Sequence, residues 1–320
     1  MMKPTNNKRH GYADVTALAV NTRIAYSKGW ACFQDYCEEK GANPLAVTPE
    51  QMSEFFLELG SRAPSSGGQP LSMRTLVLYR SAINRRYVEA NRPSPTHHPQ
   101  VRAVLKGLAR RYGTAPRRVQ ALREHHILCM LEHCGESLIG LRNAALLALG
   151  FSAALRRSEL CILRTEDIEI LPPLPGEESR KMLVHIRRSK TDQEGQGQRI
   201  AIPEGRWIQP IKRLEAWLRG SGIRRGYVFQ TMSRDGSLRG RPLHHSDIPR
   251  LVKHYAKAIG LNPDEVAGHS LRAGFVTSAA VHHARMDKIM EITRHKDPET
   301  VMRYIRDVEL FRDHAGEKFL

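Results

Sequence analysis

The chain has 320 residues, of which 41% are apolar and 26% charged, and Lys plus Arg exceed Asp plus Glu by 50 to 33. This length predicts two domains, and this composition excludes wholesale disorder. No apolar run approaches the roughly 20 residues that cross a bilayer, and residues 1–15 have no apolar signal core. We therefore expect a cytoplasmic protein that is neither secreted nor embedded in a membrane.

The formal net charge of +17 indicates a polyanionic partner. Nucleic acid is the first candidate and an acidic membrane surface the second, and a charge that only keeps the protein in solution is the plain alternative. The five cysteines form no Cys-x-x-Cys pair and the adjacent histidines chelate poorly, so we predict no metal. No Gly-rich phosphate loop is present, so we expect neither a nucleotide nor another cofactor.

The first half of the chain has a helical pattern throughout. Helices are predicted over residues 16–41, 48–60, 71–91 and 98–113. The second of them begins with a capping box, because Thr48 is followed by Pro49 at the first helical position and by Gln51. Gly and Pro then interrupt the pattern, which predicts an interdomain linker at 114–118. We expect an all-helical domain at 1–113 and a second domain at 119–320.

Most of the excess charge lies between Arg74 and Arg118, where eleven basic residues accompany one acid, Glu89. Both helices in this stretch place apolar residues on one stripe and basic residues off it, so two basic faces can neutralise a row of phosphates. A solvated face is the alternative, although such faces ordinarily mix both signs. The DNA contacts predicted here are Arg80, Arg85, Arg86, Lys106, Arg110 and Arg111.

The second domain mixes helices with a few strands. Residues 182–189 and 199–203 alternate like strands and predict a small antiparallel hairpin or three-stranded sheet. Helices are predicted over residues 123–135, 137–154, 156–168, 210–222, 246–260, 269–284, 286–295 and 298–306, with coil at 234–242. Ser246 is predicted to cap its helix, whose N-terminus can enter a major groove. The base-reading residues predicted there are His245, Ser246 and Arg250.

Four segments of the second domain carry charged and aromatic side chains in a characteristic order. They are Ala154–Leu160 (ALRRSEL), Lys190 after the first strand, His269–Arg272 (HSLR), and Arg294–His295 with Tyr304 nine residues later. Together they resemble the catalytic segments of the tyrosine recombinase (phage integrase) family, closest in layout to its Cre-like two-domain members. The resemblance implies a mainly α fold: a helical core-binding domain and a mostly helical catalytic domain with a small antiparallel sheet.

The resemblance also implies a chemistry for the three principal residues. Tyr304 would attack a phosphodiester and form a 3′-phosphotyrosyl link that stores the bond energy. Arg156 and Arg272 would meet the charge on the non-bridging oxygens, because a guanidinium is planar, always charged and bidentate toward phosphate. Arg157 is an alternative to its neighbour, but with Arg156 in the role Glu159 falls at the family's i+3 position.

The remaining roles implied by the resemblance are supporting ones. His269 would accept the tyrosine proton or support a phosphate oxygen, and Lys190 would protonate the leaving 5′-oxygen. His295 would form a hydrogen bond with the phosphate, and Glu159 would orient this network of side chains. Many relatives have Gly where Arg294 stands, so this chain places an extra cation beside the site.

The resemblance implies a site-specific recombinase whose two domains clamp double-stranded DNA at inverted repeats. In the family four protomers exchange strands through a Holliday junction, without metal or nucleotide, and a tail such as residues 307–320 docks on a neighbouring protomer. A type IB topoisomerase-like nicking and closing enzyme shares this residue set and remains an alternative. A non-catalytic DNA-binding protein of the same fold is the third hypothesis.

Overall fold

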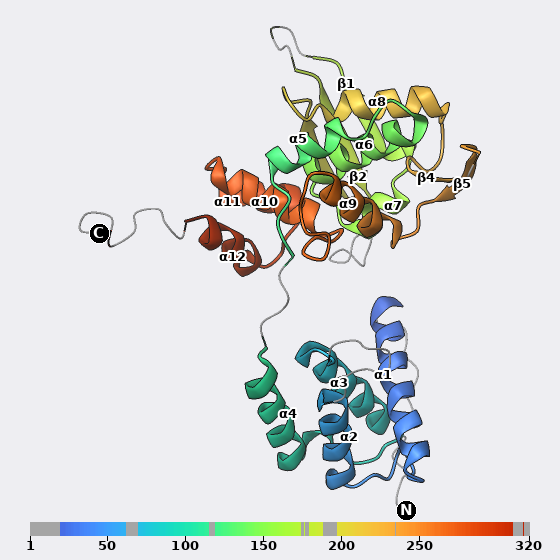
Figure 1. Cartoon of the computed structure of the whole chain (residues 1–320), viewed down its shortest axis with the longest axis vertical. Coiled ribbons are helices and arrows are strands. Elements are labelled where there is room, and N and C mark those ends of the chain that lie inside the picture. The colour runs from blue at the N-terminus through green and yellow to red at the C-terminus, as the bar shows by residue number, and fades with distance from the viewer. Residues whose placement is uncertain are drawn as a thin grey trace, which may run out of the picture. The chain divides into compact units, whose positions relative to one another are not determined.

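The computed structural model describes residues 20–61, 70–114, 119–173, 176, 179–187, 197–233, 235–309 and 316. The chain divides into two compact units, Met1–Arg117 and Arg118–Leu320. Helices dominate both units, and short antiparallel strands occur only in the described part of the second (Figure 1). The predicted mainly α fold is therefore confirmed. Within the described ranges, no helix is long and apolar enough to cross a membrane.

The first unit packs its helices around an aromatic core. Its helices are α1 (Val20–Glu39), α2 (Pro49–Ser61), α3 (Met73–Glu89), the 3-10 turn η1 (Pro95–His97) and α4 (Pro99–Tyr112). The Phe55 ring packs edge-on against Phe33 and Phe56, at centroid distances of 5.0 and 5.1 Å. The predicted capping box is confirmed, because the Thr48 amide donates to Gln51 Oε1 at 2.9 Å and the Gln51 amide to Thr48 Oγ1 at 3.3 Å.

Two glycines let the helices of this unit approach closely. A Cβ on Gly29 would lie 2.7 Å from the Tyr79 ring, and one on Gly60 would lie 2.6 Å from Leu108. α1 therefore lies against α3, and α2 against α4. The apolar stripes of α3 and α4 face inward, since Leu76 and Leu105 are buried. The basic residues that alternate with these stripes are consequently held on the outer faces.

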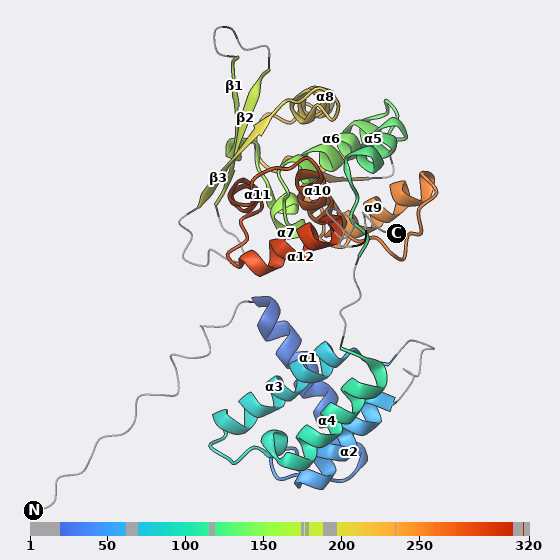
Figure 2. The same ribbon diagram turned by 90° about the vertical axis from the view of Figure 1, so that its left-hand side faces the viewer.

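The second unit sets two small sheets beside a helical body (Figures 1 and 2). Its helices are α5 (Glu124–Glu132), α6 (Leu138–Ser152), α7 (Arg157–Ile162), the 3-10 turn η2 (Thr165–Asp167), α8 (Pro210–Ser221), α9 (Asp247–Ala258), α10 (Ser270–Val281), α11 (Met286–Thr293) and α12 (Pro298–Glu309). Strands β1 (Ile168–Leu171), β2 (Lys181–Ile186) and β3 (Gln198–Pro203) form an antiparallel sheet in the order β1-β2-β3. Val184 pairs with Ile168 on one side and Ile200 on the other.

A second hairpin lies where coil was predicted. Strand β5 (Leu238–Pro242) pairs with β4 (Gln230–Met232) in antiparallel register, so the prediction of coil at 234–242 was wrong for residues 238–242. The strand's sequence, LRGRP, has no alternating apolar pattern. Its pairing depends instead on the partner strand, since the Gly240 amide donates to the Gln230 side chain at 3.0 Å.

The core of the second unit centres on α6, which is buried along most of its length. Trp217 of α8 is fully buried there, and its indole nitrogen donates to the Val228 carbonyl at 2.8 Å. α10 also crosses this core, and the segment that precedes α5 packs closely against it. A Cβ on Gly274 of α10 would collide with the Leu122 backbone, and the Leu122 amide donates to the Ser270 carbonyl at 3.1 Å. This packing fixes the position of α10, which carries Arg272.

Candidate active site

Arg156 lies at the sharp turn between α6 and α7. α6 is followed by Ala153 and Ala154, and Ala154 adopts a left-handed backbone conformation with φ +46°, which turns the chain. Arg156 then occupies the N-cap position of α7, and its amide donates to Glu159 Oε2 at 2.8 Å. Glu159 is thus the returning half of a capping box, with an arginine where Ser or Thr usually stands.

The buried carboxylate of Glu159 joins two arginines that are far apart in sequence. Its Oε1 accepts from Arg156 Nη1 at 2.8 Å, and its Oε2 accepts from Arg294 Nη2 at 2.6 Å. The Arg156 Nη2 also donates to the Arg294 carbonyl oxygen at 3.3 Å. Arg157, by contrast, is exposed and packs beside Gly268 and the start of α9. Of the two adjacent arginines, only Arg156 belongs to this cluster.

Arg272 lies in the first turn of α10 and is 1% exposed. Its Nη1 donates to the Ala154 carbonyl at 2.8 Å, and its Nη2 donates to the carbonyl of Thr293 at the end of α11. Burial, and then the charges of Arg156 and Arg294, lower the pKa of Arg272 to about 9. A phosphate near this guanidinium would relieve that crowding of positive charge.

The two candidate histidines flank the arginines and are held neutral. Burial first, and then the charges of Arg272 and Arg156, lower the pKa of His269 below its ordinary value. The same causes, in the same order, lower the pKa of His295 to about 4. His269 keeps an exposed edge at the N-cap position of α10, and its side chain makes no cap hydrogen bond. A neutral, accessible imidazole can accept a proton, as the role expected of His269 requires.

Thr293 sets the tautomer of His295. The Thr293 hydroxyl donates to the Ile289 carbonyl at 2.7 Å, so its oxygen acts as acceptor toward His295 Nδ1 at 2.9 Å. Nδ1 therefore carries the proton and Nε2 a lone pair, so in this tautomer the neutral His295 ring has no N–H left to donate to a phosphate. No sequence pattern indicated Thr293, whose carbonyl accepts from Arg272 and whose hydroxyl oxygen accepts from His295.

Tyr304 lies half-buried on α12 and packs against a small apolar cluster that contains Val276, Ile289 and Val301. Its phenol is an electrostatic neighbour of the arginine cluster, since the charge of Tyr304 acts to raise the pKa of Arg272. The structure therefore brings together Arg156, Glu159, His269, Arg272, His295 and Tyr304. Among the described residues there is no cluster of acids, cysteines and histidines fit to hold a metal ion.

Lys190 lies outside the described residues. The strands on either side of its segment are β2, which ends at Ile186, and β3, which begins at Gln198. β3 contacts α11, whose last turn carries Thr293 (Figure 2). Just before the segment, Arg187 donates to the buried carboxylate of Asp167 at 2.5 Å, which fixes the end of β2 against the turn after α7.

The predicted DNA contacts of the first unit fall into two groups. Lys106, Arg110 and Arg111 are exposed on α4. On α3, Arg80 is half-buried, and Arg85 and Arg86 both donate to Glu89, at 2.7 and 3.0 Å. The lone acid of this basic stretch thus pairs with two of the six predicted contacts, a detail that a count of net charge does not show.

In the second unit, the prediction that Ser246 caps α9 was wrong in its chemistry. Ser246 occupies the N-cap position, but its hydroxyl lies 2.7 Å from His244 Nδ1 and caps no helix amide. The side chain that closes the turn is Asp247, which accepts from the His244 amide at 2.9 Å. His245 and Arg250 are exposed beside it, and Arg250 also contacts Asp247 at 3.5 Å.

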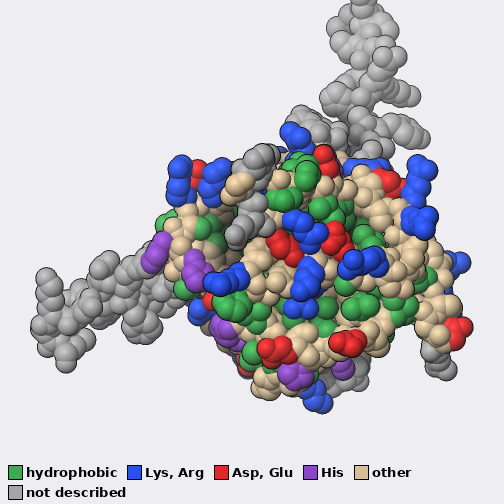
Figure 3. Space-filling view, turned by 90° about the horizontal axis from the view of Figure 1, so that it is seen from above, with side chains coloured by type: hydrophobic (Ala, Val, Ile, Leu, Met, Phe, Trp, Pro, Cys, Tyr) green, Lys and Arg blue, Asp and Glu red, His purple; other side chains and the backbone are tan. Residues whose placement is uncertain are grey.

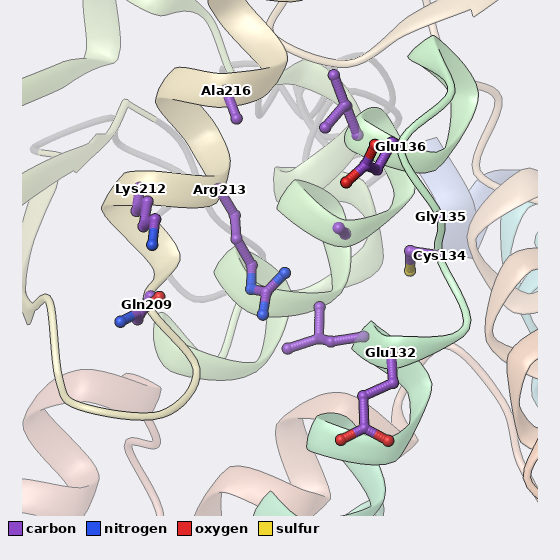
Figure 4. A pocket seen from close by; sticks show the side chains of 11 residues that line it. Glu132, Cys134, Gly135, Glu136, Gln209, Lys212, Arg213 and Ala216 are labelled. Atoms are coloured by element: carbon purple, nitrogen blue, oxygen red, sulfur yellow. The ribbon is translucent and has the colours of Figure 1, made fainter.

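Two other features of the second unit lie apart from this cluster. Figure 3 views the end of the unit that carries β1 and α8, where basic and acidic side chains alternate as on an ordinary solvated face. A pocket of about 340 Å³ lies between the end of α5, α6 and the start of α8, with Glu132 and Glu136 on one side and Lys212 and Arg213 on the other (Figure 4). None of the six clustered residues lines this pocket.

Comparison with known proteins gives the family of this chain. Residues 120–309 match the model of the phage integrase family. The chain is 34% identical over 303 residues to an integrase/recombinase XerD homolog of Selenomonas ruminantium, covering 93% of this chain and 84% of that protein. It is 24% identical to the tyrosine recombinase XerD of Rickettsia conorii, covering 90% and 89%.

Two solved structures share the fold. The XerH recombinase bound to its palindromic difH substrate, in a post-cleavage complex, aligns with a TM-score of 0.64 and 16% identity, covering 91% of this chain and 78% of that one. A lambda integrase dimer bound to a COC′ core site aligns with a TM-score of 0.59 and 17% identity, covering 91% and 90%. The chain belongs to the phage integrase family, the tyrosine recombinases, and is an enzyme of that class.

Proposed function

We propose that this protein is a site-specific DNA recombinase that cleaves and rejoins duplex DNA through a 3′-phosphotyrosyl intermediate on Tyr304. The observation that carries the proposal is the buried arginine cluster. Arg156 and Arg272 lie beside one carboxylate, with two neutral histidines and the Tyr304 phenol as electrostatic neighbours. Such a cluster is suited to a phosphate whose negative charge grows in the transition state.

In the proposed step the Tyr304 oxygen attacks phosphorus and the bond to the 5′-oxygen breaks. The phenolic proton passes to His269, which is neutral and accessible. The leaving 5′-oxygen takes a proton from Lys190, and Arg156 and Arg272 bind the non-bridging oxygens. Religation is the reverse reaction, in which the 5′-hydroxyl attacks the phosphotyrosine. The proposed reaction therefore consumes no nucleotide and uses no metal.

The wider assembly is proposed from the relatives. XerH is bound to a palindromic substrate and lambda integrase is a dimer on a core site. We propose by analogy that this chain binds inverted-repeat DNA, in the cytoplasm, and that four protomers exchange strands through a Holliday junction. Residues 307–320, expected to dock on a neighbouring protomer, lie largely outside the described residues.

The test uses nicked duplexes made from inverted repeats in the DNA that flanks the gene. A nick near the cleavage position lets a short strand diffuse away, so the covalent adduct accumulates. The parent protein should give an adduct that survives SDS, with or without EDTA. Tyr304→Phe should bind the same duplex and give no adduct, because only the hydroxyl is removed.

Several other outcomes would overturn the proposal. Adduct formation by Tyr304→Phe would place the nucleophile elsewhere, and cleavage that EDTA abolishes and magnesium restores would exclude the arginine mechanism. Relaxation of supercoiled DNA without a specific site would favour a topoisomerase-like enzyme. No adduct on any DNA would favour a non-catalytic DNA-binding protein.

A further inference from the structure

Arg294 is a buried arginine in a backbone conformation that arginine disfavours. It ends α11 in the left-handed region, with φ +56° and ψ +41°, and its amide donates to the Met290 carbonyl at 2.7 Å. Helices commonly end this way at Gly, because a side chain in this region costs roughly 1–2 kcal/mol. A residue keeps such a disfavoured conformation only when its surroundings hold it there. Here the contacts of the Arg294 side chain and carbonyl do so.

The Arg294 side chain is 2% exposed, so it does not reach a DNA surface. Its Nη2 pairs with Glu159 at 2.6 Å, whereas its Nε and Nη1 have no hydrogen-bond partner among the described atoms. Burying a cation so incompletely paired is unfavourable for folding. Packing stability therefore does not account for an arginine at this position.

Arg294 instead closes a ring of contacts around Arg156. Its Nη2 holds Glu159 Oε2, Glu159 Oε1 holds Arg156 Nη1, and its own carbonyl oxygen accepts from Arg156 Nη2. Both terminal nitrogens of Arg156 are thereby fixed. Because the single negative charge of Glu159 is divided between two guanidinium groups, it does not fully neutralise Arg156. A net positive charge therefore remains in this part of the site.

We propose that Arg294 is a positioning residue that aims the Arg156 guanidinium at the phosphate and keeps Glu159 from neutralising it. The inference rests on the proposed function, since it assigns Arg294 a task in that same site. In this proposal the Arg294 side chain acts on Arg156 only through its ion pair with Glu159. Its effect must therefore vanish when Glu159 can no longer form the ion pair.

The test is single-turnover cleavage of the nicked duplex by the parent, Arg294→Gly, Arg294→Lys, Glu159→Gln and the double variant Arg294→Gly/Glu159→Gln. Gly adopts the left-handed conformation without strain, so Arg294→Gly tests the side chain and not the backbone. We expect cleavage to fall about 10- to 100-fold, as a misplaced catalytic group does, with DNA affinity within about threefold of the parent. Arg294→Lys keeps the charge and should recover part of the rate.

The double variant separates positioning from a merely structural role, and the pKa of His295 checks that the charge at position 294 has been removed. In the Glu159→Gln background, Arg294→Gly should cause little further loss, and in Arg294→Gly the pKa of His295, followed by NMR, should rise because one of the charges that lower it is gone. Parent-like cleavage by Arg294→Gly, losses that multiply in the double variant, or Arg294→Lys no better than Arg294→Gly would each overturn the inference. A parent protein that forms no Tyr304 adduct would overturn the proposed function instead.

Discussion

Arg272 donates to the carbonyl oxygen of Ala154, a residue 118 positions earlier, at 2.8 Å. That carbonyl is presented by a left-handed turn, and the other end of the same guanidinium reaches the Thr293 carbonyl. The Arg272 side chain thus connects the turn before Arg156 to the end of α11, directly before Arg294 and His295. The arginine expected to bind phosphate therefore also joins its own helix, α10, to these two segments.

This double role predicts the behaviour of two substitutions at position 272. Arg272→Ala should slow cleavage by about 100- to 1,000-fold, or ~2.7–4 kcal/mol, the loss typical of a removed transition-state donor. Arg272→Lys should recover little, because an ammonium cannot span two carbonyls and a phosphate as a planar guanidinium does. Single-turnover cleavage at saturating DNA measures both rates. Full activity in the Lys variant would show that charge alone suffices.

The adjacent arginines provide a matched pair at the start of α7. Arg156→Ala should reduce cleavage about as strongly as Arg272→Ala, because its guanidinium is fixed by Glu159 and the Arg294 carbonyl. Arg157→Ala should leave the rate within a few-fold of the parent, since this side chain is exposed near Gly268. Adduct yield from the nicked duplex compares them. The reverse pattern would mean that Arg157 swings into the site on DNA.

For Lys190 the prediction concerns the leaving group. Lys190→Ala should slow cleavage of ordinary DNA, and a duplex with a 5′-bridging phosphorothiolate should restore the rate, because a thiolate leaves without a proton. Arg156→Ala serves as the control, since a better leaving group does not replace a missing charge on the phosphate. Equal defects of Lys190→Ala on both substrates would remove the lysine from the acid role.

His295 makes the stability of the second unit depend on pH. Its folded pKa of about 4 lies below the unfolded value of 6.5, so the unfolded chain binds more protons between these two values. The free energy of unfolding should therefore decrease as pH falls from 6.5 toward 4, by up to about 3 kcal/mol from this residue. Urea titrations of the parent and of His295→Asn measure it, and identical pH profiles would contradict the assignment.

The basic faces of the first unit are tested by salt. Replacing Lys106, Arg110 and Arg111 by Gln should flatten the slope of log affinity against log salt by about 0.9 for each phosphate that the protein no longer neutralises. Glu89→Gln should do the opposite, because it frees Arg85 and Arg86 from their ion pairs. Titrations on cognate and random DNA should give the same changes. If neither the three Gln substitutions nor Glu89→Gln changes the salt dependence of the affinity, this basic stretch is a solvated face that does not contact DNA.

Local sequence patterns were enough to predict most of the helices and the residue types of the candidate site, although the helix predicted over 156–168 ends at Ile162 and is followed by a 3-10 turn and a strand. Periods of three and four residues place Leu76 and Leu105 inward, and Thr48 with Gln51 predicts where a helix begins, because these signals depend on near neighbours in the chain. The order of Arg, His, Arg, His and Tyr along residues 156–304 likewise indicates the family.

Local patterns did not predict which charged side chains are buried or form ion pairs, because these properties depend on contacts between distant segments. Arg156 and not Arg157 joins the cluster around Glu159, because the two differ in contacts with residues more than a hundred positions away. Arg294 is buried against Glu159, 135 positions earlier, for the same reason. The segment LRGRP is a strand because it pairs with the neighbouring strand β4. A local pattern fixes backbone geometry, whereas burial, ion pairing and strand pairing depend on the segments that the fold brings alongside.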